Sequence, residues 1–305
     1  MRRCLQLAAC GRGFVAPNPM VGAVIVYNNK IIGEGFHAQY GGPHAEVQAI
    51  ASVKDKTLLK NSTLYVNLEP CSHYGKTPPC VDLILKKQIP RVIIGHEDPF
   101  PEVSGRGIKK LREAGVETLC GVLEDECKEL NKRYLTYMFQ HRPYIILKWA
   151  QSSDGFIDRY REENDGEAPV KFSNSFTQML VHKTRAEESA IMVGTRTLRL
   201  DKPALTVRYW NGNNPERIIA DSKQPLQQQV KTLFYERKIQ SLMVEGGAKL
   251  LQSFLNENLW DEIHIEVASF LLKEGVTAPI PKGALQSVQK CENSTLFRYK
   301  NSCNS

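Results

Sequence analysis

Three side chains early in the chain have the types and spacing of a zinc site. His44 offers an imidazole, and Cys71 and Cys80 offer two thiols. Three such ligands leave the fourth tetrahedral position of zinc open to water, as in a catalytic site rather than a closed structural one. Glu46 stands two residues after His44 and could lie beside that water without binding the metal. The pattern therefore predicts hydrolysis, with Glu46 as general acid and base.

The order of these residues along the chain indicates the class of hydrolytic enzyme. Zinc deaminases of nucleobases have a His-x-Glu segment and, later in the chain, a Pro-Cys segment with a second cysteine close behind. His44, Glu46 and the pair Pro70-Cys71 fit that order. Eight residues separate Cys71 from Cys80, where the common signature has two. The longer loop restricts the match to fewer families of zinc deaminases, and it does not weaken the match.

Other interpretations of neighbouring residues stay open. Cys71 and Cys80 could form a purely structural zinc site with His73, although a closed site would leave Glu46 without a task. His37 and His73 are predicted as loop or surface residues rather than ligands. Asn18, between two prolines, could cap a turn or point its amide at a heterocycle, and the sequence favours neither.

The composition is that of an ordinary globular protein with two domains. The chain has 305 residues, 42% hydrophobic and 24% charged, so each half can bury its own core. It has no apolar run on the order of 18 residues, so no transmembrane helix and no membrane partner are expected. Residues 1–13 predict a helix rather than a signal peptide. Eight cysteines without the spacing of a disulfide framework fit a reducing, cytoplasmic location.

The net charge of +7 has two interpretations. It could be a solvated basic surface, or it could attract phosphorylated small molecules. Nucleic acid is not expected as a partner, because the chain has no dense stripe of Lys and Arg with interleaved aromatic residues.

Alternating strands and helices must bring the zinc ligands together. Two β-branched runs around Asn28-Asn29 predict a hairpin, and His44 and Cys80 each fall at a predicted helix start, where the helix dipole favours a thiolate. The alternation predicts an α/β sandwich with helices on both faces. The predicted strands are 23–27, 30–36, 64–68, 91–95 and 116–120, and the predicted helices are 5–9, 44–53, one starting near Pro79, 108–114 and a long one over 124–139.

A break around Pro143 predicts two domains, 1–141 and 142–305. The second half also alternates, and ligands of such open sheets bind beyond the carboxyl ends of the strands. A polar tail after Lys290 is expected to fray. The predicted strands of this half are 144–149, 190–193, 217–220, 241–244 and 262–268, and its predicted helices are 176–185, 230–237 and one opened by Gly246-Gly247 that runs to Leu255.

The first-half motifs resemble the RibD family of bifunctional riboflavin biosynthesis enzymes. The resemblance is carried by the segments 16–22 (APNPMVG), 43–46 (PHAE) and 69–80 (EPCSHYGKTPPC), and it extends over essentially the whole chain. It implies a cytidine-deaminase-like α/β/α sandwich in which His44, Cys71 and Cys80 hold one Zn²⁺ and Glu46 shuttles the proton. The implied reaction replaces the 2-amino group of a diaminopyrimidinone ribosylamino phosphate by oxygen.

The second half resembles the reductase domain of the same family, which has a dihydrofolate-reductase-like α/β fold and uses NADPH to reduce a ribosyl group to ribityl. Matching of positions implies cofactor contacts at Gln151, Thr197, Asp201, Ser222 and Gly247. It implies substrate contacts at Arg185, Leu205, Arg208 and Glu245. A guanidinium pairs with phosphate through two hydrogen bonds, which suits a sugar phosphate, although each arginine alone could equally be a solvated surface charge.

The resemblance also implies phosphorylated pyrimidines as small-molecule partners and a homo-oligomer. Two departures from the family pattern are Lys202, where Asp or Asn is usual, and a short stretch between Asp221 and Ser241. A second hypothesis therefore keeps the deaminase but makes the second half a degenerate reductase that binds ligand or supports oligomerisation. A third is a nucleic-acid base editor or zinc-bearing RNA-binding protein, which the missing basic stripe disfavours.

Overall fold

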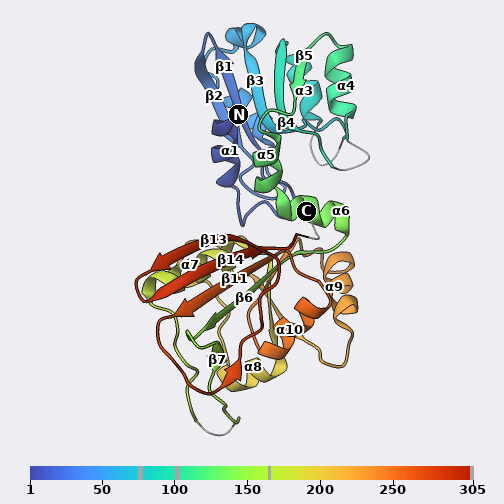
Figure 1. The fold of residues 1–305 in the computed structure, drawn as a ribbon. Helices are drawn as coiled ribbons and strands as arrows, with labels where there is room; N and C mark the ends of the chain where they lie inside the picture. The colour runs from blue at the N-terminus through green and yellow to red at the C-terminus, as the bar shows by residue number, and fades with distance from the viewer. Residues whose placement is uncertain (75–77, 100–103, 164–165, 303–305) are drawn as a thin grey trace. The chain divides into compact units, whose positions relative to one another are not determined.

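The computed structural model describes residues 1–74, 78–99, 104–163 and 166–302. The chain forms two compact units, Met1–Gln140 and His141–Ser305, each built around its own sheet (Figure 1). The ring of His141 packs edge-on against Phe234 of the second unit, with 5.6 Å between the ring centroids. Among the described residues, no helix combines the length and the apolar character needed to cross a lipid bilayer.

The first unit is a five-stranded sheet with helices on both faces. Strand β1 is antiparallel to β2 and β3, whereas β3, β4 and β5 are parallel, in the order β2-β1-β3-β4-β5. Its strands are β1 (Gly22–Tyr27), β2 (Lys30–Phe36), β3 (Thr63–Leu68), β4 (Arg91–His96) and β5 (Glu117–Cys120). Its helices are α1 (Arg2–Ala9), α2 (Ala45–Ser52), the 3-10 helix η1 (Lys56–Asn61), α3 (Cys80–Lys86), α4 (Arg106–Glu113), α5 (Glu124–Leu130) and α6 (Lys132–Gln140).

The core of this unit explains why strands and helices alternate along the chain. The apolar faces of the strands and of α2, α3 and α4 form one buried cluster, which includes Ile25, Ile50, Ile84, Ile94 and Leu111. A smaller cluster on Ala8, Met20 and Leu130 belongs to the side of α1 and α5. Burial of apolar surface on both sides of one sheet is what the sandwich architecture requires. The predicted α/β/α sandwich is confirmed.

The single long helix predicted over 124–139 is wrong, because α5 and α6 are separate helices that meet at Asn131. The side chain of Asn131 is buried and holds the loop before β1: its Oδ1 accepts from Met20 N at 2.8 Å, and its Nδ2 donates to Met20 O at 3.0 Å. The backbone of Asn131 leaves helical geometry (φ −97°, ψ 17°). The hydrogen bonds between Asn131 and Met20 therefore offset the free-energy cost of interrupting the helix.

The second unit is a seven-stranded sheet in the order β13-β14-β11-β6-β10-β8-β9. Strands β11, β6, β10, β8 and β9 are parallel, and β14 and β13 extend the sheet as an antiparallel hairpin. The strands are β6 (Tyr144–Gln151), β7 (Phe156–Asp158), β8 (Ala190–Gly194), β9 (Glu216–Ala220), β10 (Ser241–Val244), β11 (Glu262–Ala268), β12 (Val276–Thr277), β13 (Ala284–Cys291) and β14 (Ser294–Lys300), with β7 and β12 paired separately. The helices are α7 (Ser175–Glu187), α8 (Thr195–Asp201), α9 (Leu226–Tyr235) and α10 (Ala248–Asn256).

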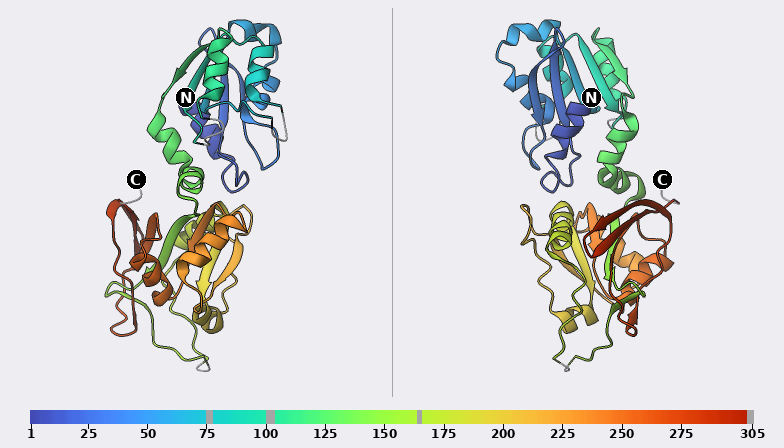
Figure 2. Two further views of the ribbon diagram at one scale, coloured as in Figure 1. Left: turned by 90° about the vertical axis from the view of Figure 1, so that its right-hand side faces the viewer. Right: turned by 60° about the vertical axis from the view of Figure 1, so that its left-hand side comes forward.

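Helices cover both faces of this sheet as well. Leu233 of α9 and Phe254 of α10 share one buried cluster with Leu147, Met192 and Val244 of the central strands. Helix α7 lies on the opposite face, as the two views of Figure 2 show. The predicted open α/β sheet with a dihydrofolate-reductase-like fold is confirmed.

The prediction of a fraying tail after Lys290 is wrong for the residues that the structure describes. Strand β14 pairs along its whole length with β11, and Phe297 and Tyr299 pack against the core. Ser294 also donates from Oγ to Glu266 Oε1 at 3.0 Å. Its other neighbour, β13, is exposed over nearly its whole length, so β14 is the inner strand of this hairpin. Strands β7, β12, β13 and β14 and helix α8 were not predicted, and α9 starts at Leu226 rather than Val230.

Candidate active site

The three predicted zinc ligands converge in the first unit. His44 is the N-cap of α2 and Cys80 is the first residue of α3, as predicted, while Cys71 lies in the loop after β3. His44 Nδ1 lies 3.5 Å from Cys71 Sγ and 3.3 Å from Cys80 Sγ, and the three donor atoms all lie within 4.8 Å of one another. Among the described residues, this group is the one His, Cys, Asp and Glu cluster close enough to hold a metal ion, and His73 is not part of it.

The chemistry of the donor set fits zinc. The pKa of Cys71 is lowered to about 4, because the Cys80 thiol and His44 both stabilise its thiolate. The pKa of Cys80 is raised, because the adjacent Cys71 thiolate and burial both oppose a second negative charge. Two neighbouring thiolates repel each other, and a divalent cation between them removes that cost. One imidazole and two thiolates are ligands that Zn²⁺ prefers.

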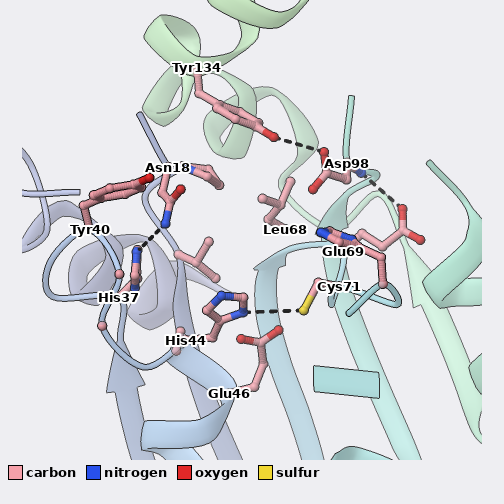
Figure 3. A pocket seen from close by; sticks show the side chains of 16 residues that line it. Asn18, His37, Tyr40, His44, Glu46, Leu68, Glu69, Cys71, Asp98 and Tyr134 are labelled. Atoms are coloured by element: carbon pink, nitrogen blue, oxygen red, sulfur yellow. Dashed lines mark hydrogen bonds between the residues drawn. The ribbon is translucent and has the colours of Figure 1, made fainter. Parts of the chain in front are cut away.

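Glu46 is buried beside these ligands and is not one of them. Its side chain lines the same cavity, and only 3% of the residue is exposed. Burial and the negative charge of Cys71 raise the pKa of Glu46 to about 7, and a bound cation would lower that pKa again. Figure 3 shows Glu46 below His44 and Cys71, with its carboxylate turned toward them. A carboxylate so placed can exchange protons with a molecule in the cavity.

The cavity above the ligands has a volume of about 400 Å³, enough for a small heterocycle with its substituents. One wall carries Asn18 and His37, and the other carries Glu69 and Asp98 (Figure 3). It is lined by Asn18, Pro19, Val21, His37, Tyr40, Gly41, Gly42, His44, Ala45, Glu46, Leu68, Glu69, Cys71, His73, Asp98 and Tyr134. Residues 75–77 of the cysteine loop lie outside the described residues.

Asn18 and His37 form a hydrogen-bonded pair on the cavity wall. His37 is buried, so its prediction as a loop or surface residue is wrong as regards the surface. Its Nδ1 lies 3.1 Å from Pro43 O, which can only accept, so Nδ1 carries the proton. Because burial lowers the pKa of His37, the ring is neutral and its Nε2 accepts from Asn18 Nδ2 at 3.0 Å. Of the two predictions for Asn18, the amide at a ligand cavity is the one that the structure supports.

Sequence reasoning missed the opposite wall. Asp98 follows β4, and its Oδ1 accepts from the hydroxyl of Tyr134 on α6 at 3.2 Å. Burial and the Asp98 charge raise the pKa of Tyr134, so the phenol stays protonated as a donor. The acidic residue after a predicted strand was the available signal, since ligands gather at the carboxyl ends of parallel strands.

Four of the five residues predicted to bind the cofactor lie at or after the carboxyl ends of the parallel strands in the second unit. Gln151 ends β6, Thr197 lies on α8 after β8, Ser222 follows β9, and Gly247 is the N-cap of α10 after β10. Strand pairing brings these ends to one edge of the sheet. A Cβ built on Gly247 would lie 3.1 Å from Thr197 Oγ1, so these two positions are neighbours.

Two of the predicted cofactor side chains already have partners within the chain. Gln151 Oε1 accepts from Trp149 Nε1 at 2.7 Å. Asp201, at the end of α8, pairs with the buried Arg161 at 2.5 Å, and Arg161 also pairs with Asp158. Ser222 is exposed. The cofactor roles of these residues therefore stay predictions.

The predicted substrate residues differ in burial and in their partners. Arg185 and Glu245 form a buried ion pair, and Arg185 Nη1 also donates to Thr206 O at 3.2 Å. Leu205 is buried with Ile191 and Val193. Arg208 is exposed, and its Nη1 donates to Thr206 Oγ1 at 3.0 Å. A second cavity of about 710 Å³ lies elsewhere in this unit, lined by Arg159, Glu167, Ala168, Pro169, Val170, Lys171, Phe270, Leu271 and Leu272.

Two family models match the chain. The cytidine and deoxycytidylate deaminase zinc-binding region matches residues 1–96. The RibD C-terminal domain matches residues 143–235 and 226–303. The first match includes the three candidate zinc ligands, and the second includes all strands of the second sheet.

Relatives and solved structures match over nearly the whole chain. The riboflavin biosynthesis protein RibD of Aquifex aeolicus (strain VF5) is 37% identical over 91% of this chain and 88% of its own length. That of Escherichia coli (strain K12) is 32% identical over 98% and 94%. The crystal structure of a diaminohydroxyphosphoribosylaminopyrimidine deaminase/5-amino-6-(5-phosphoribosylamino)uracil reductase from Thermotoga maritima is 34% identical, covers 99% of this chain and 97% of its own, and has a TM-score of 0.90.

Proposed function

We propose a residue-level mechanism from the premise that this chain belongs to the RibD family of riboflavin biosynthesis proteins. The chain is bifunctional: the first unit is a zinc-dependent deaminase and the second is an NADPH-dependent reductase. Its substrates are phosphorylated pyrimidines. The observation that carries the deaminase mechanism is the convergence of His44, Cys71 and Cys80 beside the buried Glu46 in one cavity.

The deaminase step uses Glu46 as the proton carrier. Zinc held by His44 Nδ1 and the sulfurs of Cys71 and Cys80 would polarise water so that it attacks near neutral pH. Glu46 takes one proton as the water oxygen bonds to C2 of the diaminopyrimidinone ring, and delivers a proton to the departing amino group. Water is consumed, the C2–N bond breaks and ammonia leaves. Asn18, oriented by His37, presents its amide oxygen to ring N–H groups of the substrate.

The reductase step uses the carboxyl edge of the second sheet. NADPH supplies the hydride, and the task of the protein is to orient the nicotinamide against the sugar carbon. We assign Gln151, Thr197, Asp201, Ser222 and Gly247 to the cofactor. We assign Arg185, Leu205, Arg208 and Glu245 to the ribosyl phosphate substrate. What supports this assignment is that neighbouring strand ends carry most of these residues.

The finer points of assembly and location are also proposals. We infer a cytoplasmic enzyme, because the cysteines among the described residues are free thiols, as expected in a reducing compartment. We infer a homo-oligomer by analogy with the family. Sedimentation equilibrium of the purified chain would contradict this second inference if it gave the monomer mass at all concentrations.

A coupled assay tests the function. Zinc-loaded protein is given the diaminopyrimidinone ribosylamino phosphate and NADPH, and ammonia release and the absorbance loss of NADPH are recorded together. Both signals are expected. Ammonia release without NADPH oxidation would favour the degenerate-reductase hypothesis. NADPH oxidation that occurs only when the aminouracil is supplied directly would show that the first unit lacks deaminase activity.

A further inference from the structure

Glu69 is a buried carboxylate that the deaminase chemistry leaves without a role. It follows β3 and stands two residues before the zinc ligand Cys71, with 3% of its surface exposed. It is not one of the three metal-binding side chains. A buried carboxylate requires partners that offset its desolvation, so its contacts indicate its function.

Among the described residues, Glu69 accepts hydrogen bonds from four backbone N–H groups. Its Oε2 accepts from Asp98 N at 3.1 Å and from Gly105 N at 3.0 Å. Its Oε1 accepts from Gly107 N at 2.8 Å and from Ile108 N at 3.2 Å. One carboxylate thus binds the chain directly after β4 and also the first turn of α4.

These contacts make Glu69 the N-terminal cap of a helix from elsewhere in the sequence. The N-cap residue of α4 is Gly105, which has no side chain with which to cap. Glu69 satisfies the N–H groups of Gly107 and Ile108, which lack partners inside the helix. Its negative charge also lies at the positive end of the helix dipole.

Gly107 is required for this arrangement. A Cβ built there would lie 2.4 Å from Pro70 O and 3.0 Å from Glu69 Oε1. A side chain at this position would therefore push α4 away from the Glu69-Pro70 segment. The close approach of backbone to carboxylate indicates a fitted contact rather than a chance one.

Glu69 connects to the cavity through Asp98. The backbone N–H of Asp98 binds Glu69, and its side chain lines the cavity and accepts from Tyr134. Figure 3 shows this series of contacts from Glu69 to Asp98 to Tyr134 along the wall opposite Asn18 and His37. Because Glu69 holds the backbone of Asp98, it fixes where the Asp98 carboxylate stands relative to the zinc ligands.

We propose that Glu69 is a positioning residue of the deaminase, which sets the substrate-facing wall of the cavity by holding Asp98 through its backbone. The proposal rests on the proposed deaminase function of the first unit. Glu69 acts on substrate binding and not on zinc, because its carboxylate contacts none of the ligand atoms among the described residues and faces the Asp98 loop.

The test is Glu69→Gln in the full-length zinc-loaded chain. The amide keeps the shape of the side chain but turns an NH₂ group toward two of the four N–H donors, so those bonds are lost. The KM of deamination should rise about tenfold, the size expected for the loss of about one net hydrogen bond to a charged group, with a smaller change in kcat. Zinc content and NADPH-dependent reduction of the aminouracil should stay unchanged. Glu117→Gln, an exposed carboxylate on β5 of the same unit, is the matched control.

A double-mutant cycle separates positioning from a general structural effect. If Glu69 acts through Asp98, then Asp98→Ala alone should raise the KM, and Glu69→Gln should add nothing to it. Additive effects would overturn the proposal, as would loss of zinc or of reductase activity in Glu69→Gln. If that variant fails to fold, Gly107→Ala is measured by the same criteria, because it disturbs the contact while leaving the carboxylate in place. A wild-type chain that releases no ammonia would contradict the proposed function instead of this inference.

Discussion

Arg185 and Glu245 bind each other through two parallel hydrogen bonds, from Nε to Oε1 at 2.8 Å and from Nη2 to Oε2 at 2.6 Å. Their side chains are only 12% and 10% exposed. Arg185 lies on α7 and Glu245 directly follows β10, so the pair ties a helix to the carboxyl edge of the sheet. Both residues were predicted from resemblance to contact substrate, and the structure adds that each is the other's partner.

This pair predicts a stability defect that depends on both partners. Glu245→Leu leaves the buried Arg185 charge without its carboxylate, which should lower the free energy of unfolding by about 3–5 kcal/mol. Arg185→Met/Glu245→Leu should recover a large part of that loss, because an apolar pair carries no unpaired charge. Urea unfolding followed by fluorescence measures both. Equal destabilisation in the single and double variants would contradict the role of the pair.

The same pair predicts a loss of stability in acid. Burial alone would raise the pKa of Glu245, but the hydrogen bonds and charge of Arg185 outweigh it and lower the pKa below its ordinary value. A lowered folded-state pKa stabilises the fold above the unfolded value of about 4.3, and this contribution is lost as the pH falls through the folded-state value. The stability difference between wild type and Arg185→Met/Glu245→Leu should therefore narrow below pH about 4. A constant difference down to pH 2 would show that Glu245 does not titrate in this way.

Glu46→Gln should separate proton transfer from metal binding. The amide cannot carry the proton, so kcat of deamination should fall by about 10²–10⁴-fold. Zinc content should be unchanged because the three ligands are intact. Ammonia release and metal analysis give the two readouts, and Glu34→Gln, which changes a partly exposed carboxylate on β2 that is paired with Arg3, serves as control. Near-normal turnover of Glu46→Gln would remove Glu46 from the mechanism.

Cys71→Ala should lose zinc and deamination together. One imidazole and one thiol are too few ligands to retain the ion in competition with a chelator. The reductase, supplied directly with the aminouracil, should keep its rate because its residues lie in the other unit. A metallated and active Cys71→Ala protein would contradict the ligand assignment.

Local patterns were enough to predict much of the fold and the convergence of His44, Cys71 and Cys80. Hydrophobic periodicity and turn residues predicted the hairpin and most of the strands, because those signals act within a few residues. His44 and Cys80 were predicted at helix starts and are found there. Metal ligation restricts residue type so strongly that three positions and an adjacent glutamate indicate a chemistry without any structure.

What could not be predicted depends on contacts between distant segments. Asn131 interrupts a helix because it binds Met20, and Glu69 caps α4 across 38 positions of sequence. Strand β14 forms because β11 offers it an edge to pair with, although most of the chain after Lys290 that flanks it is polar. The local sequence does not predict these partners, because the type of a polar residue does not reveal whether its side chain is buried or solvated.

Asn131→Ala tests one of these long-range contacts. It leaves Met20 N without its acceptor inside the core, while Met20 O keeps Asn67 Nδ2 as a donor at 3.0 Å. The free energy of unfolding should fall by about 1–3 kcal/mol, the cost of one buried unsatisfied donor. Thermal or urea unfolding checks this against Asn256→Ala, which changes an exposed asparagine on α10. Equal stability of the two variants would mean that the contact contributes nothing.

Arg208→Ala addresses the reductase substrate. Arg208 is exposed at the surface of the second unit, so its guanidinium is accessible to a phosphate, whereas that of Arg185 is occupied by Glu245. Loss of one charge-assisted pair should raise the KM for the aminouracil phosphate about 10- to 100-fold and leave deamination unchanged. Arg237→Ala, which removes an exposed arginine paired with Glu216 in the same unit, controls for net charge.

Because a phosphate contact is electrostatic, the wild-type KM should also rise with salt more steeply than that of Arg208→Ala. Loss of deamination alone would show that Arg208 has been assigned to the wrong activity.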